Sequence, residues 1–441
     1  MTRIMHIALQ GCLGARGVRI GLTADTGGHI AYLLSLVAAL DRTGRVEQDV
    51  VTRQFASPAL GLVGQHESEP LGGASRLLRV PGAEPGYLPK EALWRDLPAL
   101  ADALEARLRR DPPDLIHAHY ADAGSLALAM RERLGLPFVF TAHSLGRAKA
   151  QAMPDLARSA TLARRVEAED RAIAAADLVI ASSRDERERQ YGLYARPRRI
   201  EVIAPGCDLA RFEAAQPTAS VAEAVDRFLH RPEKPPVLAL ARPVRRKNLA
   251  ALVDLFGRSE RLRERANLVI YAGCRDDLGA EEAEKREVFA ELFALIDRHD
   301  LWGSVALPKR HEPGEVPAIM ALARRRGGVH ATLAHGEPFG LTLVEAAAAG
   351  LPVVAPASGG PIDILDQCRH GLLVPPNDAR AAEDALLSLL ESPALWRASA
   401  RSGREQAARF TWDGHAARYL DALERAGLVH PSRPHPVASA G

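Results

Sequence analysis

The chain has 441 residues, which is too many for one ordinary hydrophobic core and predicts two domains of roughly 200 residues each. Its formal net charge of +2 gives no field strong enough to attract nucleic acid or a membrane surface, so any bound anion must be held by local arginines and lysines. The four cysteines form no Cys-x-x-Cys pair, which disfavours a disulfide framework and a zinc site. No apolar run reaches the ~18 residues of a membrane span, and we expect a cytoplasmic protein.

In the first half of the chain, short apolar runs alternate with longer amphipathic stretches. The apolar runs have the length of β-strands and lie at Ile4–Leu9, Asp49–Thr52, Leu77–Val80, Leu115–Ala118, Phe138–Thr141, Leu178–Ala181 and Ile200–Ile203. Helical patterns lie between most of them, notably at His29–Leu40, Glu91–Arg109 and Leu162–Ala176. This alternation predicts a parallel sheet with helices on both faces, in a domain of residues 1–205.

A polar stretch with several prolines and charges, residues 206–236, interrupts the pattern and is interpreted as the connection between two domains. The alternation then resumes, with strands expected at Val237–Leu240, Leu268–Tyr271, Val305–Leu307, Val329–Thr332 and Val353–Ala355. The helices expected with them include Leu249–Phe256, Glu281–Asp297, Val316–Arg325 and Leu341–Ala349. Residues 237–410 are therefore predicted to form a second doubly wound α/β domain.

The last part of the chain is predicted to be mainly helical. A final helix over about residues 411–427 is expected to pack back on the first domain, and residues 428–441 are expected to be a disordered tail. The predicted fold is thus two facing Rossmann-like domains with a deep cleft between them. Because ligands of open α/β sheets bind beyond the carboxyl ends of the strands, functional residues are sought directly after strands.

Two strand ends of the first domain carry residues suited to ligand binding. Gly27, Gly28 and His29 follow the first strand and open the first helix, where glycines let the backbone approach a ligand and the helix N-terminus favours an anion. A tight turn explains the glycine pair equally well. His143 follows the strand at Phe138–Thr141 and is suited to hydrogen-bond a sugar hydroxyl.

The second domain carries a basic loop and a pair of glutamates. Arg242 and Lys247, after the strand at Val237–Leu240, are suited to clamp a diphosphate and stabilise its charge, although a solvated basic turn has the same composition. Glu337 and Glu345 stand eight positions apart, near one face of a helix. On spacing alone, a first-turn carboxylate and a solvated charge explain this pair as well as a ligand site does.

Metal binding and several enzyme classes are not indicated by the sequence. His117 and His119 alternate on one face of a strand end, but no third ligand is evident, so packing or lining a cleft is the preferred interpretation. No Asp-x-Asp motif is present, which disfavours a metal-bound diphosphate. The dinucleotide-binding, P-loop and Gly-x-Ser-x-Gly motifs are missing as well. We therefore expect neither a metal nor a cofactor.

Several strings, in matching order and spacing, resemble the retaining GT-B glycosyltransferases with a Glu-x7-Glu motif (glycosyltransferase family 4). Within them, the chain is similar to the glucosyltransferase part of the sucrose-phosphate synthases over nearly all of residues 4–425. The matching strings are Asp25-Thr26-Gly27-Gly28, Leu88-Pro89-Lys90-Glu91-Ala92-Leu93-Trp94, Phe138-Val139-Phe140-Thr141-Ala142-His143-Ser144-Leu145-Gly146, the stretch from Glu337 to Glu345, and Gly359-Gly360-Pro361-Ile362-Asp363-Ile364-Leu365.

The resemblance implies a nucleotide-sugar site. Arg242 and Lys247 match the pair that stabilises the donor diphosphate. Glu345 matches the carboxylate that binds the ribose hydroxyls of the nucleotide. Glu337 matches the carboxylate that contacts the hydroxyls of the donor sugar, and His143 matches the histidine that contacts the same sugar. The implied donor-binding set is Gly27, Gly28, Arg242, Lys247, Glu337, Phe339, Gly340, Leu341 and Glu345, and the implied catalytic set is Arg242, Lys247, Glu337 and His143.

The resemblance also implies a phosphorylated acceptor. The acceptor-side set is His29, Lys90, Arg147, Lys149, Arg164 and Arg165, and its five cations are more than a neutral sugar requires. The expected reaction moves glucose from UDP-glucose or ADP-glucose to fructose 6-phosphate, and a separate sucrose-phosphate phosphatase would then dephosphorylate the sucrose 6-phosphate. His29 stands where the family usually has glutamine, which puts acceptor identity in question.

Three alternatives stay open on the sequence. A mannosylfructose-phosphate synthase using GDP-mannose and a sucrose synthase-like enzyme using free fructose would share the donor-side residues. An inactive GT-B protein acting as a sensor or regulatory subunit would have no reason to retain all four donor-side charges. No nucleic-acid or membrane partner is expected under any of these interpretations.

Overall fold

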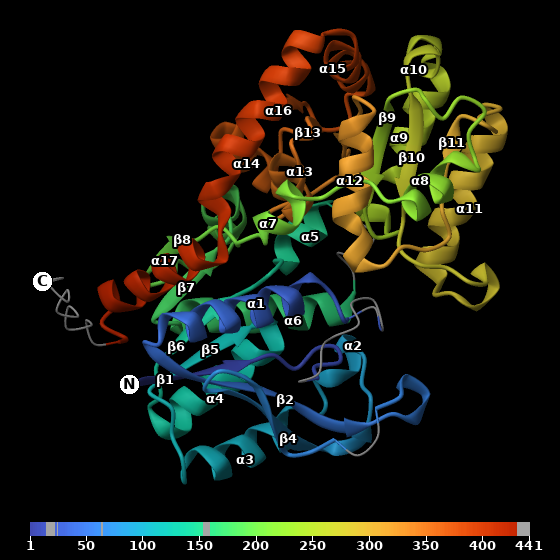
Figure 1. Cartoon of the computed structure of the whole chain (residues 1–441). Coiled ribbons are helices and arrows are strands. Elements are labelled where there is room, and N and C mark those ends of the chain that lie inside the picture. The colour runs from blue at the N-terminus through green and yellow to red at the C-terminus, as the bar shows by residue number, and fades with distance from the viewer. Residues whose placement is uncertain (15–22, 24, 63–64, 153–158, 430–441) are drawn as a thin grey trace, which may run out of the picture. The chain divides into compact units, whose positions relative to one another are not determined.

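The computed structural model describes residues 1–14, 23, 25–62, 65–152 and 159–429. The chain folds into two compact units (Figure 1). The first unit consists of Met1–Gly206 together with Trp412–Gly441, and the second unit is Cys207–Thr411.

The described residues of the first unit form an eight-stranded sheet in the order β3-β4-β2-β1-β5-β6-β7-β8. Neighbouring strands are parallel except for β3, which runs antiparallel to β4. The strands are β1 (Thr2–Ile7), β2 (Val46–Ala56), β3 (Ser68–Gly72), β4 (Ser75–Gly86), β5 (Leu115–His119), β6 (Phe138–Thr141), β7 (Leu178–Ala181) and β8 (Ile200–Val202).

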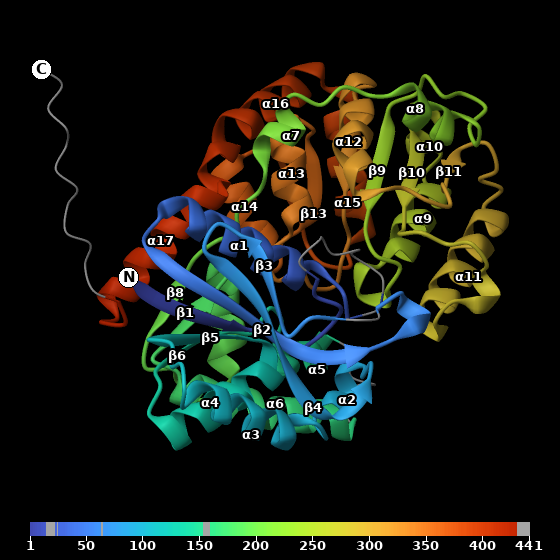
Figure 2. The ribbon, with the colours of Figure 1, turned by 60° about the horizontal axis from the view of Figure 1, so that its bottom comes forward.

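Helices cover both faces of this sheet because alternate strand residues point to opposite sides. Met5 and Ile7 of β1 join a core with α3, α4 and α6, whereas Ile4 joins a core with α1 and α17. Figure 2 shows these two helical layers on either side of the sheet. The helices are α1 (Gly28–Thr43), α2 (Lys90–Leu93), α3 (Leu97–Leu108), α4 (Tyr120–Leu134), α5 (Gly146–Ala152), α6 (Ala160–Ala175) and α17 (Trp412–Arg425).

The described residues of the second unit form a six-stranded parallel sheet in the order β11-β10-β9-β12-β13-β14. Its strands are β9 (Pro236–Leu240), β10 (Asn267–Tyr271), β11 (Val305–Ala306), β12 (Val329–Ala331), β13 (Val353–Pro356) and β14 (Gly371–Val374). Its helices are α7 (Leu209–Glu213), α8 (Ala219–Asp226), α9 (Leu249–Arg258), α10 (Glu260–Arg265), α11 (Ala283–Arg298), α12 (Val316–Arg325), α13 (Leu341–Ala349), α14 (Gly360–Cys368), α15 (Ala379–Glu391) and α16 (Pro393–Ala407). Helices α9, α11 and α15 share one large core with the sheet.

The two doubly wound halves predicted from the sequence are present, and each predicted strand has a counterpart. The interpretation of residues 206–236 as a connection is wrong for most of that stretch. Residues 207–235 fold into the second unit, where Phe212, Val221 and Val225 are buried and α7 contacts α13. Helices as short as α7 and α8 do not show from their own sequence which domain they pack against.

The helix predicted over Glu91–Arg109 is divided into α2 and α3. Asp96, fully buried between them, accepts a hydrogen bond from the backbone N–H of Ala83 at 2.7 Å and pairs with Arg53 at 3.3 Å. These contacts tie the break between the helices to the end of β4. A buried carboxylate with charged and backbone donors outweighs the continuous helical pattern.

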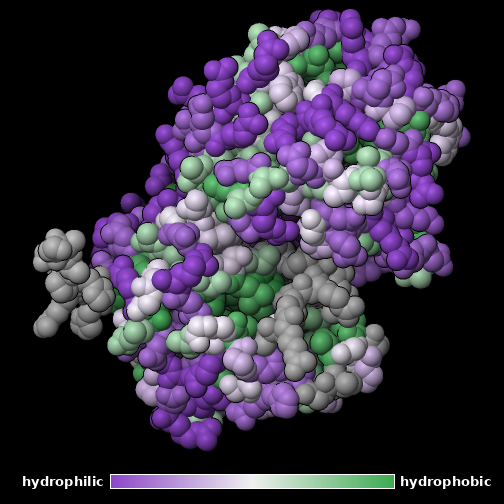
Figure 3. Space-filling model, in the orientation of Figure 1, coloured by the Kyte–Doolittle hydropathy of each residue, from purple (hydrophilic) through white to green (hydrophobic). Residues whose placement is uncertain are grey.

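Hydrophilic side chains cover most of the face of the molecule seen in Figure 3. Along the described ranges, no helix combines the length and the apolar composition that crossing a bilayer requires. The four cysteines are free thiols, with Cys274 exposed and Cys12, Cys207 and Cys368 buried.

Candidate active site

The strand order of each sheet reverses beside the first strand of its unit. In the first unit β1 lies between β2 and β5, and in the second unit β9 lies between β10 and β12. At such a switch point the loops after neighbouring strands leave in opposite directions and make room for a ligand. His143 follows β6, the basic loop follows β9, and Glu337 follows β12, so these predicted site residues lie at carboxyl strand ends.

Lys247 and Glu337 form the centre of the site in the second unit. The turn after β9 brings Nζ of Lys247 into an ion pair with Oε2 of Glu337, and the two side chains are only 17% and 14% exposed. Burial by itself would raise the pKa of Glu337, but the charges of Lys247, Arg246 and Arg242 outweigh burial and lower that pKa. Glu337 is therefore held as a carboxylate among three cations.

The loop that carries these cations is fixed by backbone contacts. Asn248, at φ 51°, donates from Nδ2 to the carbonyl of Leu333 at 3.1 Å, and Arg246 donates to the carbonyl of Gly336 at 2.7 Å. Lys247 and Leu333 line a small pocket between the ends of β9 and β12. The Arg242 side chain is exposed. Its guanidinium is thus accessible to an anion that binds beside the fixed side chains of Arg246, Lys247 and Glu337.

Glu345 lies inside α13, which begins after Gly340 and ends before Gly350. Both glycines have positive φ, at 100° and 67°, a conformation that strongly favours glycine. Burial raises the pKa of Glu345 to about 7, and the neighbouring charge of Arg211 on α7 only partly offsets that rise. Glu345 is therefore poised to change protonation near neutral pH.

A second glycine pair holds the loop before α13 in place. A Cβ on Gly359 would lie 2.2 Å from the carbonyl oxygen of Glu337, and one on Gly360 would lie 2.1 Å from that of Phe339. Gly360 also donates its N–H to the carbonyl of Glu337 at 2.9 Å. The ring of Phe339 is buried against Phe410. The stretch Glu337–Leu341 is thus fixed from both sides, with its helix N-terminus as a source of backbone N–H groups.

In the first unit, Asp25 anchors Lys90. The buried Asp25 carboxylate accepts hydrogen bonds from the Tyr87 hydroxyl at 3.0 Å, from the Lys90 backbone N–H at 2.9 Å and from Nζ of Lys90 at 3.0 Å. Gly28 is exposed and a Cβ there would meet nothing within 4 Å. Among the described residues, the space beside Gly28 is therefore open, whereas Lys90 is fixed at the start of α2.

His143 stands in a strained backbone conformation at φ 56°, directly after β6. Its Nε2 is 2.9 Å from Nδ1 of His119, and its ring centroid lies 5.9 Å from that of His29. Burial, with a smaller effect of His29, lowers the pKa of His143 well below the usual range, so its ring is neutral. A strained, neutral imidazole at a strand end is typical of a functional position.

The predicted acceptor cations of α5 and α6 differ in their surroundings. Arg165 pairs with Glu169 at 2.7 Å and donates to Ser144, so it supports the loop after His143. Arg147 pairs with Asp170 and stacks on the Tyr194 ring at 4.7 Å. Arg164 is exposed and Lys149 is half-buried. Arg147 and Arg165 therefore have internal partners that a phosphate would have to share.

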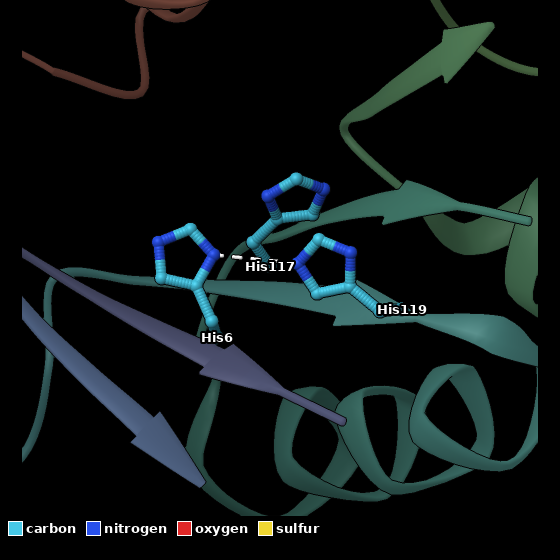
Figure 4. A group of neighbouring side chains, drawn as sticks. All are labelled: His6, His117 and His119. Carbon is cyan, nitrogen blue, oxygen red and sulfur yellow. Dashed lines mark hydrogen bonds between the residues drawn. The ribbon is translucent and has the colours of Figure 1, made fainter. Parts of the chain in front are cut away.

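Sequence reasoning missed His6 as a neighbour of His117 and His119. Figure 4 shows the three buried rings, from β1 and β5, turned toward one another. One nitrogen of each lies within 4.8 Å of the others, so the third histidine that the sequence left unidentified is present. Each ring nitrogen also has a hydrogen-bond partner: His6 bonds Gln48 and His119, His119 bonds His143, and His117 bonds Thr141 and Tyr419.

Both halves of the chain match family models of glycosyltransferases. Residues 27–206 match the glycosyl transferase 4-like domain and residues 221–408 match glycosyl transferases group 1. The chain is 35% identical, over 97% of its length, to sucrose-phosphate synthase 4 of Arabidopsis thaliana. It spans about half the length of the curated relatives it matches, 48% in this case.

Solved structures with the same fold include a sucrose-phosphate synthase from Thermosynechococcus elongatus, at a TM-score of 0.78 and 24% identity, over 96% of this chain and 99% of that one. Another is Anabaena HepE in complex with UDP-glucose, at a TM-score of 0.68 and 20% identity, over 96% of this chain and all of that one. Both comparisons place the whole chain in the GT-B fold. With a 4-like domain followed by a group 1 domain, the chain belongs to the family 4 glycosyltransferases of that fold.

Proposed function

We propose that this protein transfers glucose from UDP-glucose to fructose 6-phosphate with retention of the anomeric configuration, giving sucrose 6-phosphate and UDP. The observation that carries the proposal is the 35% identity to a sucrose-phosphate synthase over 97% of the chain, which spans the strand-end residues of both units. The Anabaena protein of the same fold is in complex with UDP-glucose, which supports a nucleotide-sugar donor.

The positive charges of the second unit are proposed to stabilise UDP as it leaves the glucose. The C1–O bond to the diphosphate breaks as the C2 hydroxyl oxygen of fructose 6-phosphate bonds to C1 of glucose. The departing phosphate oxygen accepts the hydroxyl proton on the same face, which gives retention. Arg242 and Lys247 stabilise the charge that develops on UDP, and such fixed cations contribute mainly in the transition state.

On the acceptor side, Lys90 and the cations of α5 and α6 are proposed to bind the 6-phosphate. Lys90 is the best prepared, because Asp25 holds both its backbone and its ammonium. No metal is proposed in the reaction, since Arg242 and Lys247 supply the positive charge that a divalent cation would otherwise provide. A cytoplasmic location and a separate sucrose-phosphate phosphatase complete the proposal.

A matrix of donors and acceptors tests this function. The purified chain is incubated with UDP-glucose, ADP-glucose or GDP-mannose, each with fructose 6-phosphate or fructose, in the presence and absence of EDTA. We expect nucleoside diphosphate release only with UDP-glucose and fructose 6-phosphate together, an α-glucosyl product by NMR, and no effect of EDTA. If release occurs with free fructose but not with fructose 6-phosphate, the proposed acceptor is rejected. If it occurs with GDP-mannose but not with UDP-glucose, the proposed donor is rejected. Loss of activity in EDTA would reject the metal-free mechanism.

A further inference from the structure

A row of buried polar side chains runs from Gln48 on β2 through His6 on β1 and His119 on β5 to His143 after β6. The contacts are Oε1 of Gln48 to Nε2 of His6 at 3.2 Å, Nδ1 of His6 to Nε2 of His119 at 3.3 Å, and Nδ1 of His119 to Nε2 of His143 at 2.9 Å. Gln48, His6 and His119 are at most 1% exposed. The row crosses four neighbouring segments of the sheet and ends at the proposed donor site.

The orientation of Gln48 is fixed at the far end of the row. Its Nε2 lies 2.9 Å from the carbonyl oxygen of Val37, 3.0 Å from Oδ1 of Asp41 and 3.2 Å from Oγ of Ser75. Ser75 in turn donates its hydroxyl hydrogen to Asp41 at 2.7 Å, so its oxygen is an acceptor toward Gln48. Acceptors surround this nitrogen, so the amide NH2 must be there and Oε1 must face His6.

The position of one hydrogen then determines the next. Oε1 only accepts, so Nε2 of His6 carries a hydrogen. Burial lowers the pKa of His6 to about 4 and those of His119 and His143 well below the usual range, so each ring is neutral and has one N–H. Nδ1 of His6 therefore accepts from Nε2–H of His119, whose Nδ1 accepts from Nε2–H of His143. Nδ1 of His143 is left as a lone-pair acceptor.

We propose that Gln48, His6 and His119 are positioning residues that fix His143 in its Nε2–H tautomer, so that His143 accepts a hydroxyl hydrogen of the donor sugar through Nδ1. Among the described residues, Nδ1 of His143 has no hydrogen-bond partner, which leaves it available for that hydroxyl. The contact with the sugar rests on the proposed function, whereas the tautomer does not.

We call the hydrogen-bonded row of Gln48, His6, His119 and His143 the relay. The same contacts distinguish this relay from a metal site at His6, His117 and His119. A zinc ion needs nitrogen ligands at about 2.0–2.1 Å with free lone pairs. Here the lone pair of His6 Nδ1 is used by His119, and both nitrogens of His117 face hydroxyl groups, Thr141 at 2.9 Å and Tyr419 at 3.1 Å. The hydrogen bonds account for all three rings without an ion.

NMR of the unliganded full-length protein, labelled with ¹⁵N-histidine, tests the tautomer directly, because a protonated and a lone-pair imidazole nitrogen differ widely in ¹⁵N shift. The His143 signals are identified by their loss in a His143→Asn variant. We expect hydrogen on Nε2 and a lone pair on Nδ1. Hydrogen on Nδ1 in the wild-type protein would overturn the proposal without the need for any other variant.

Gln48→Met removes the acceptor at the start of the row while keeping its volume. His6 then gains by moving its hydrogen to Nδ1, which shifts the hydrogens of His119 and His143 in turn. We expect the His143 tautomer to switch and kcat/KM for UDP-glucose to fall by roughly three- to tenfold, the range of one lost hydrogen bond. The KM for fructose 6-phosphate should not change. An unchanged tautomer in folded Gln48→Met would overturn the relay.

His117→Leu is the matched control, since His117 is equally buried on the same strand as His119 but lies outside the row. The His143 shifts should stay as in the wild type. Changed His143 shifts in this variant, or one zinc per chain in the wild type by elemental analysis, would overturn the relay in favour of packing or a metal. An inactive protein with the expected tautomer would reject the proposed function and leave the relay standing.

Discussion

Lys247 and Arg242 are the two residues proposed to stabilise the departing diphosphate. Replacing either by methionine removes one fixed cation from the developing diphosphate charge, and we expect kcat to fall on the order of 10²-fold. Lys247→Met should also raise the pKa of Glu337, because Lys247 supplies the largest charge that lowers it. Steady-state kinetics with saturating UDP-glucose and fructose 6-phosphate measure the loss.

Arg245→Met is the control for this experiment. Arg245 lies in the same turn, but it is exposed and pairs with Glu287 at 2.6 Å rather than with Glu337. Its loss should leave kcat within about twofold, since exposed ion pairs contribute little. If Arg245→Met were as impaired as Lys247→Met, the effect would belong to the loop as a whole and the separate role of Lys247 would be refuted.

Glu345 gives a prediction of pH dependence. Its pKa of about 7 in the folded protein lies above the ordinary value of 4.5, so the carboxyl is mainly protonated below pH 7. If Glu345 binds the two ribose hydroxyls as the resemblance implies, the protonated form accepts from them less well. We expect the Kd for UDP-glucose, measured by calorimetry, to rise as the pH falls from 8 to 6. Glu345→Gln should bind more weakly at pH 8 and lose this dependence. A pH-dependent Kd that persists in Glu345→Gln would show that another group titrates.

The same shift predicts an effect on stability. A group whose pKa is raised by folding stabilises the protein while it is protonated, and that contribution is lost as the pH rises through the folded value. The wild type should therefore lose stability relative to Glu345→Gln between about pH 5 and pH 8. Thermal unfolding of both proteins across this range provides the comparison, and a constant difference in Tm would contradict the raised pKa.

At the scale of elements, the loop before α13 depends on Gly359. A Cβ there would lie 2.2 Å from the carbonyl oxygen of Glu337, so Gly359→Ala must displace the stretch that carries Glu337 and Phe339. We expect a lower Tm and loss of UDP-glucose binding.

Gly135→Ala is the reference for a left-handed glycine without a clash, because Gly135 lies at φ 72° and ψ 13° and no described residue is within 4 Å of an added Cβ. It should cost only the ~1 kcal/mol of backbone strain. Gly359 has the same φ but a ψ of −151°, a region that only glycine adopts, so Gly359→Ala adds backbone strain to the clash. A loss of stability in Gly359→Ala no larger than that in Gly135→Ala would contradict both the clash and the added strain at Gly359.

How well the elements could be predicted depended on their burial. The inner strands of parallel sheets are covered on both faces and appear as apolar runs, so β1, β5, β9 and β13 were found within a few residues. The strands that were missed lie at sheet edges. β3 contains Glu69 and Pro70 and is the antiparallel edge, and β14 is a short edge strand that begins at Gly371. The other two edge strands, β8 and β11, were predicted, because each contains β-branched residues. An edge position alone therefore does not hide a strand; β3 was missed because it has no β-branched residue and includes Pro70.

The candidate site could be predicted in part, because its residues stand in short sequence motifs, whereas the contacts between them join residues far apart in the chain. Single motifs indicated Lys247, Glu337 and His143 as candidate site residues. The ion pair between Lys247 and Glu337 joins residues 90 positions apart, and it exists because β9 and β12 are neighbours in the sheet. His6 reaches His119 across 113 positions for the same reason, and a lone histidine in an apolar strand gives no local signal. Strand order, which the sequence does not show, decides which residues meet.

At the scale of the whole molecule, the chain leaves the first unit after Gly206 and returns to it at Trp412. Helix α17 then completes the core on one face of the first sheet, where Tyr419, Leu420 and Leu423 pack with Ile4 and with residues of α1. The first unit therefore consists of two segments that are separated by the entire second unit. Its stability should depend on a helix encoded at the far end of the chain.

Leu420→Ala tests this dependence. Leu420 is 1% exposed, so its truncation should cost about 2–5 kcal/mol in the first unit, whereas truncation of exposed Arg418 on the same helix should cost little. Hydrogen exchange measured by mass spectrometry resolves where protection is lost. In Leu420→Ala we expect β1, α1 and α17 to lose protection together while β9–β14 keep theirs. Loss confined to α17 would mean that the first sheet is stable without the helix, and loss shared with β9–β14 would mean that the two units unfold as one.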